Sequence, residues 1–94
     1  LDVHVYPNPF EIWGYDSFAT FPGLAEGSAL RIYSFNGELV AEVDAAPANG
    51  NGDAAATWDG RNLKGGYVGS GVYFFTGTGA DGSDFRDKMV VIRR

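Results

Sequence analysis

The sequence predicts an all-β fold, a sandwich of about seven antiparallel strands that forms one domain over residues 1–94. Three observations support this prediction. Short segments with a period of two recur along the chain, turn-forming pairs such as Asn-Gly and Asp-Gly separate them, and no window has the 3.6-residue period of a helix. With 94 residues the chain has room for one core, and its 45% of apolar residues is enough to form it.

The first strand is expected at residues 1–6, where Leu, Val and Val alternate with polar residues. Pro7-Asn8-Pro9 ends it, because proline cannot donate a hydrogen bond to a sheet. A crossover loop is expected next. Five aromatic residues between positions 10 and 21 are too dense for a solvated loop, and we expect a second strand at 17–21, closed by Pro22-Gly23.

A hairpin is predicted for residues 29–34 and 38–43, because Asn36-Gly37 between them is typical of a two-residue turn with two positive φ angles. The alternation of its strands assigns each side chain to a face. The inward set is Leu30, Ile32, Leu39, Ala41 and Val43, and the outward set is Arg31, Glu38 and Glu42.

In the second half, residues 45–53 have no periodicity and are expected to form a loop before a short strand at 54–58. A glycine-rich irregular segment then leads to a last pair of strands at 72–76 and 85–92. Both strands contain stretches that are apolar on both faces. They should therefore be central in a sheet or covered on the second face by a loop or a partner.

Charge and composition exclude several classes of function. The net charge of −5 argues against binding of nucleic acid or anionic lipid, which requires clustered Lys and Arg. The absence of cysteine excludes disulfides and thiol chemistry. No apolar run is long enough to span a membrane, and no signal-peptide pattern opens the sequence. A single basic cluster stands out near the end of the sequence: Arg86, Lys88, Arg93 and Arg94.

No group of residues predicts catalysis or a cofactor. Gly77–Gly82 matches a dinucleotide-binding glycine pattern, but a strand is expected after it where such a site needs a helix. His4 has no neighbouring carboxylate to orient it and should be exposed. A calcium loop is a weak candidate at Asn49, Asn51 and Asp53, since a closing bidentate carboxylate is missing. We therefore expect a domain that is not an enzyme.

Two groups of residues resemble known families. Trp58-Asp59-Gly60-Arg61-Asn62, with Gly65 and Gly69–Phe74 after it, is similar to the signature of the immunoglobulin-like domain named after the flagellar hook-capping protein. Val5–Phe10 resembles the Tyr-Pro-Asn-Pro opening of type IX secretion C-terminal sorting domains, and Leu30–Tyr33, Gly37–Val40 and Lys88–Arg93 are also similar to these domains. The resemblance spans nearly the whole chain.

The resemblance implies an immunoglobulin-like sandwich that is secreted or held at the cell surface after passing through the periplasm. An upstream cargo domain and recognition by secretion machinery or surface proteins are implied, and the position of the last strand favours sorting over hook capping. The residues implied in partner recognition are Lys88, Met89, Val90, Val91, Ile92, Arg93 and Arg94. The residues implied as structural are Pro7, Asn8, Pro9, Trp58, Asp59, Gly60, Gly71 and Tyr73, with Trp58 packed across the sandwich, Asp59-Gly60 in a turn and Gly71 allowing close passage of the chain.

Two other functions stay open at this point. The alternative prediction is a structural or adhesive subunit of an extracellular assembly, with a contact patch at Trp13, Tyr15, Phe18 and Phe21 and strand donation by residues 1–6. A third and weaker alternative is a carbohydrate-binding module that stacks sugars on Trp13, Tyr15 and Tyr67.

Overall fold

The computed structural model describes residues 4–14, 17–47 and 53–94, and over these residues the chain forms eight β-strands. Their bounds are β1 Phe10–Ile12, β2 Ala19–Ala25, β3 Ala29–Tyr33, β4 Leu39–Asp44, β5 Ala46–Pro47, β6 Asp53–Trp58, β7 Gly71–Thr78 and β8 Asp84–Arg93. None of the described segments is a helix of the length and hydropathy needed to cross a membrane.

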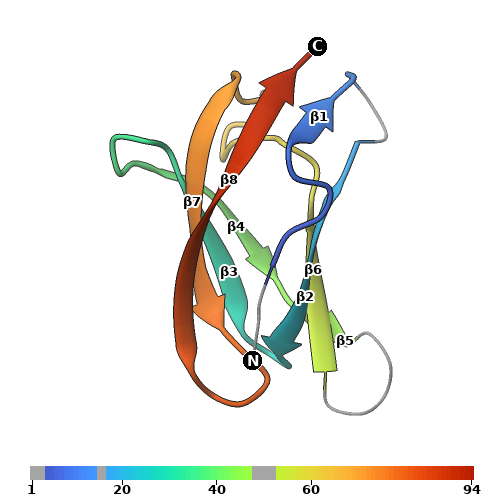
Figure 1. Ribbon diagram of the computed structural model, residues 1–94, viewed down its shortest axis with the longest axis vertical. Helices are drawn as coiled ribbons and strands as arrows, with labels where there is room; N and C mark the ends of the chain where they lie inside the picture. Colours follow the sequence, from blue (N-terminus) through green and yellow to red (C-terminus); the bar gives the residue numbers. More distant parts are fainter. Residues whose placement is uncertain (1–3, 15–16, 48–52) are drawn as a thin grey trace.

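The strands form two facing sheets, as Figure 1 shows, which confirms the predicted sandwich. One sheet has the order β1-β8-β7-β3-β4 and the other β2-β6-β5. All pairs are antiparallel except β1 and β8, which run parallel, with Phe10 opposite Val91 and Ile12 opposite Arg93. The predicted sandwich of antiparallel strands thus includes one parallel pair.

The core lies between the sheets and consists of alternate side chains from both. Phe21 of β2 meets Phe75 of β7 edge to face, with ring centroids 5.0 Å apart. Among the described residues no polar or charged side chain is buried, so packing of apolar groups holds the sheets together. The largest fully buried side chains are Phe10, Phe21, Phe75, Ile12, Leu24, Leu30, Ile32, Met89 and Val91.

The N-terminal region differs from the prediction. Residues 1–3 lie outside the described residues, and of the expected strand at 1–6 only an isolated bridge from Tyr6 to Thr20 of β2 is seen. A strand instead follows the prolines, where a loop was expected. Phe10 and Ile12 are buried and Glu11 faces outward, so this short segment has the alternation of a strand, but its pairing partner lies some 80 residues further along the chain.

The hairpin of β3 and β4 lies where it was predicted, with a different turn. Gly37 N–H donates to Ser34 C=O at 2.9 Å, so Phe35 and Asn36 occupy the centre of the turn, and Gly37 follows with φ of 90°. A bulge shifts the register between Ile32 and Tyr33. The bulge takes Leu39 off the inward face, and Leu39 is 41% exposed, contrary to the prediction.

The second strand was expected at 17–21 with Pro22-Gly23 closing it, which is wrong, because β2 runs from Ala19 through a register shift after Phe21 to Ala25. The predicted loop at 45–53 contains the short strand β5, and Asp53 already belongs to β6. The strand β7 is central in its sheet, as its apolar pattern predicted, whereas β8 has a second neighbouring strand, β1, only at Val91–Arg93.

Candidate partner-recognition surface

The last strand, β8, contributes to both the core and the surface. Met89 and Val91 are buried, whereas Lys88, Val90 and Arg93 are exposed on the other side or at the end of the strand. Of the seven residues predicted to recognise a partner, Met89 and Val91 are thus not available to one in the folded domain. The accessible part of this candidate site is Lys88, Val90, Arg93 and Arg94, with Ile92 half-buried.

The Pro7-Asn8-Pro9 segment has a structural role beside β8. The Asn8 side-chain oxygen accepts a hydrogen bond from the Val90 N–H at 3.0 Å, on the side of β8 that faces β1. Two residues before Val90, the Lys88 N–H donates to the Asp87 carboxylate at 2.8 Å. Side chains therefore occupy edge amides that would otherwise be free to pair with another strand.

The Trp58 motif joins the two sheets at one end of the sandwich. The Trp58 ring is 2% exposed and lies 5.9 Å from the Phe10 ring and 6.1 Å from the Tyr73 ring. Its indole N–H donates to the Arg61 carbonyl at 2.9 Å, so the one polar atom of the ring is satisfied. Asp59 accepts from the Arg61 N–H at 3.0 Å and closes the turn.

Gly60 and Gly71, two glycines of the motif, differ in the space around them. Gly60 has φ of 84°, and a Cβ there would lie 2.5 Å from Ile12 Cδ1, so a larger residue is disfavoured both by the backbone and by the packing. Gly71 was expected to allow close passage of the chain, which is wrong, because the space around it is open. Tyr73 enters the core as expected, and its hydroxyl donates to the Gly69 carbonyl at 2.8 Å. Burial raises the pKa of the Tyr73 hydroxyl.

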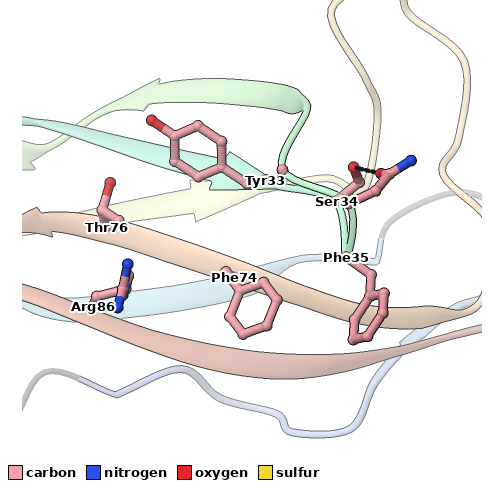
Figure 2. A pocket seen from close by; sticks show the side chains of 8 residues that line it. Tyr33, Ser34, Phe35, Phe74, Thr76 and Arg86 are labelled. Atoms are coloured by element: carbon pink, nitrogen blue, oxygen red, sulfur yellow. Dashed lines mark hydrogen bonds between the residues drawn. The ribbon is translucent and has the colours of Figure 1, made fainter.

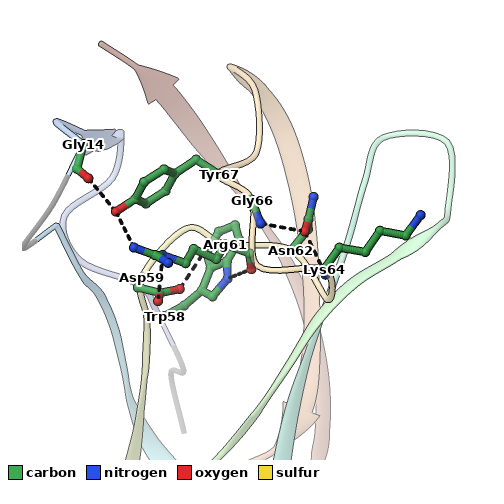
Figure 3. A network of polar contacts seen from close by, with 8 residues as sticks. All are labelled: Gly14, Trp58, Asp59, Arg61, Asn62, Lys64, Gly66 and Tyr67. Carbon is green, nitrogen blue, oxygen red and sulfur yellow. Dashed lines mark hydrogen bonds and ion pairs between the residues drawn. The ribbon is translucent and has the colours of Figure 1, made fainter.

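Tyr67 contacts several segments of the chain at the same end of the molecule (Figure 3). Its hydroxyl donates to the Gly14 carbonyl at 2.6 Å, and the Arg61 guanidinium lies over its ring at 4.7 Å from the centroid. Arg93 also lies over this ring, at 5.3 Å. A hydrogen bond to the Tyr67 oxygen raises the pKa of Arg61, which remains a cation. The Tyr67 ring thus holds two cations, that of Arg93, which was predicted to recognise a partner, and that of Arg61.

Arg94 connects the end of β8 to the N-terminal segment. Its N–H donates to the Ile12 carbonyl at 2.9 Å, its guanidinium pairs with the Glu11 carboxylate, and it lies 5.4 Å from the centre of the Trp13 ring. The last two residues of the sequence therefore have defined positions, with their charged groups at the surface.

The predicted aromatic contact patch is only partly on the surface. Trp13 is 64% and Phe18 54% exposed, but Phe21 is fully buried in the core, so its inclusion was wrong. Tyr15 lies outside the described residues. Aromatic density in the sequence could not separate the two kinds of position, since core and contact residues share this composition.

The structure tests some of the remaining predicted site residues. Tyr67 is a poor sugar platform, because Arg61 and Arg93 already lie over its ring. Asn49 and Asn51 lie outside the described residues, so the calcium prediction is not tested there. In the part of the chain that is described, no group of three or more His, Cys, Asp or Glu side chains could hold a metal ion. His4 is exposed, as predicted.

Solved structures of other proteins are similar to this chain. No protein-family model matches the chain, and no curated protein does. The chain is similar to part of PorZ from Porphyromonas gingivalis, an essential bacterial surface component of the type IX secretion system, with 27% identity and a TM-score of 0.71 over 97% of this chain and 11% of PorZ. It is also similar in fold to CopC from Methylosinus trichosporium OB3b, with 23% identity and a TM-score of 0.56 over 98% of this chain and 92% of CopC. The chain is thus an all-β sandwich whose fold recurs within a much longer surface protein.

Proposed function

We propose that this domain is a non-catalytic sorting and surface-attachment module of a bacterial protein exported by the type IX secretion system. The observation that carries the proposal is the likeness to PorZ, which extends over 97% of the chain at 27% identity. Such a module acts outside the cytoplasm, after the periplasm has been crossed. It carries an upstream cargo domain and binds the secretion machinery or a surface protein.

The accessible residues of β8 are the proposed recognition surface. Lys88, Val90 and Arg93 face solvent, while the strand itself is held by β7 along its length and by β1 at its end. A partner therefore meets side chains on a backbone that the sheet already holds in place, so binding does not have to order the backbone. Rim charges of this kind act mainly on the rate of encounter and on specificity.

Charge reversal tests the proposal better than deletion of β8, which would remove Met89 and Val91 from the core. We would fuse the domain to an exported reporter in a bacterium with a type IX system and compare Lys88→Glu/Arg93→Glu with the unaltered domain. We expect the altered fusion to remain in the periplasm, and the unaltered one to reach the surface or medium.

Lys64→Glu is the matched control, since Lys64 is exposed on a turn and forms no ion pair among the described residues. Each variant is first checked for an unchanged melting temperature. Export of the double variant at the unaltered level would refute recognition through β8, and failure of the unaltered fusion to leave the periplasm would refute the sorting function itself.

A role as a subunit of an extracellular assembly is the second candidate. It is favoured by Phe18 and Leu63, which are 54% and 65% exposed and line one cleft beside β4 and β6. Light scattering over a range of concentrations tests it. A dimer that Leu63→Lys dissociates would support assembly, and a monomer at every concentration would exclude it.

A further inference from the structure

A groove on the outer face of the five-stranded sheet has no role in the function proposed above. It has a volume of about 680 Å³ and lies between the turn that joins β3 to β4 and the outward side chains of β7 and β8 (Figure 2). Tyr33, Phe35, Phe74, Thr76 and Arg86 line it. Its volume is within the range of sites that bind ligands or the side chains of a partner.

The groove presents aromatic surface that the fold does not use. Phe35 is 76% exposed, and its ring stacks on that of Phe74 with centroids 6.4 Å apart and planes at 26°. Tyr33 and Phe74 are paired across neighbouring strands. Large rings held in place at a surface provide most of the binding energy at many protein interfaces, because they bury a large area and lose little freedom.

The charge of the groove is opposite to that of the whole chain. Arg86 lines it, and Lys88 stands next along the outward face of β8, opposite Phe74. Neither cation forms an ion pair with any described residue, and no acidic residue lines the groove. In a chain of net charge −5, this is a local positive site that favours a carboxylate.

Among the described residues, the polar side chains of the turn are engaged, whereas the Tyr33 and Thr76 hydroxyls and the Arg86 guanidinium at the groove have no hydrogen-bond partner. The Ser34 hydroxyl donates to the Asn36 side-chain oxygen at 2.6 Å and accepts from the Glu38 N–H at 3.2 Å, so both side chains hold the turn. The backbone of β7 is paired with β3 on one side and β8 on the other. The stacked rings of Phe35 and Phe74 beside the unpaired cation of Arg86 provide the two features that an apolar side chain next to a carboxylate requires.

We propose that this groove binds an acidic, apolar segment of a partner protein, with a large apolar side chain against Phe35 and Phe74 and a neighbouring carboxylate on Arg86. The groove adjoins the proposed sorting surface at Lys88, but Phe35, Phe74 and Arg86, which carry this inference, are not part of that surface. A partner bound there would also cover the outer face of β7, where Val72 and Phe74 are only half-buried and where the apolar pattern of residues 72–75 predicted a covering loop or partner.

A peptide titration tests it. The probe is a short blocked peptide that alternates Glu with Phe, added to the isotope-labelled domain at low salt and followed by the amide signals of each residue. We expect shifts centred on Phe35, Phe74 and Arg86, and weaker binding as salt rises. The same peptide with Gln in place of Glu should bind about tenfold more weakly.

Substitutions in the domain complete the test. Arg86→Gln and Phe35→Ala should each weaken binding about tenfold, because each removes one of the two contacts. Lys64→Gln, which changes an equally exposed cation on another turn, should leave the affinity unchanged. An absence of shifts at about 1 mM peptide, equal binding of the Gln peptide, or binding of oligogalacturonate in place of the peptide would each overturn the proposal.

Discussion

The Asn8 side chain binds the backbone of Val90, 82 residues later in the sequence, through a 3.0 Å hydrogen bond to the Val90 N–H. Asn8 thereby replaces a neighbouring strand at the point where β1 has not yet begun. The Tyr-Pro-Asn-Pro segment has a physical role here, which is to satisfy an edge amide and keep other strands from pairing with it.

Replacing Asn8 with Ala should leave the Val90 N–H without its protein partner. We expect a loss of about 0.5–1.5 kcal/mol in the free energy of unfolding and faster hydrogen exchange at the Val90 amide. Asn8→Asp keeps the accepting oxygen and should retain the slow exchange. An unchanged exchange rate in Asn8→Ala would show that this bond does not protect the edge.

Gly60 should be far less tolerant of substitution than Gly27. Both have positive φ, 84° and 81°, but a Cβ at Gly60 meets Ile12 at 2.5 Å, whereas the space at Gly27 is open. Gly27→Ala should cost about 1–2 kcal/mol for the backbone, and Gly60→Ala about 1–3 kcal/mol more for overpacking. Urea denaturation measures the difference. Equal costs would mean that Ile12 moves aside freely.

The ion pair of Glu11 and Arg94 should contribute little to stability. Both side chains are well exposed, at 40% and 48%, so water and salt screen the charges. A double-mutant cycle with Glu11→Gln and Arg94→Gln should give a coupling of about 0.2–1 kcal/mol that shrinks at high salt. A larger, salt-independent coupling would contradict this.

Tyr73 should make the domain sensitive to alkaline pH. Burial raises its pKa in the folded state, so the unfolded chain loses this proton first, at a pH of about 10. Its contribution to stability is complete below that pH and is lost as the pH rises toward the folded pKa. Tyr73→Phe should lower stability at neutral pH by about 1 kcal/mol, through loss of the bond to Gly69, and flatten the alkaline decline.

Denaturation at several pH values between neutral and strongly alkaline would measure both effects of Tyr73→Phe. An alkaline decline of the same steepness in the variant would show that other groups control it.

The sequence predicted those parts of the fold that depend on local pattern. The β3–β4 hairpin follows from alternation around Asn36-Gly37, although the hydroxyl of Ser34 and the bulge after Ile32 set a turn that the dipeptide alone did not predict. The strand β1 was missed because three residues after a proline are too few to establish a period, and their partner on β8 is far away in the sequence.

The candidate surface was predicted less well, for a related reason. The composition of residues 10–21 indicates many rings, but only the register of β2 against β6 shows that Phe21 points inward. Likewise, the groove brings Phe35 beside Phe74 and Arg86 from three separate segments. The apolar outer face of 72–75 was the one signal in the sequence that pointed to it.

The parallel pairing of β1 with β8 determines how the domain would respond to mechanical pulling. In Figure 1 both arrows point to the same end of the sandwich, and β8 lies between β1 and β7 there. Tension along β8 would load the hydrogen bonds on both of its sides in shear, so they would have to rupture together. A tether attached beyond Arg94 should therefore withstand drag much better than one that peels an outer strand away bond by bond.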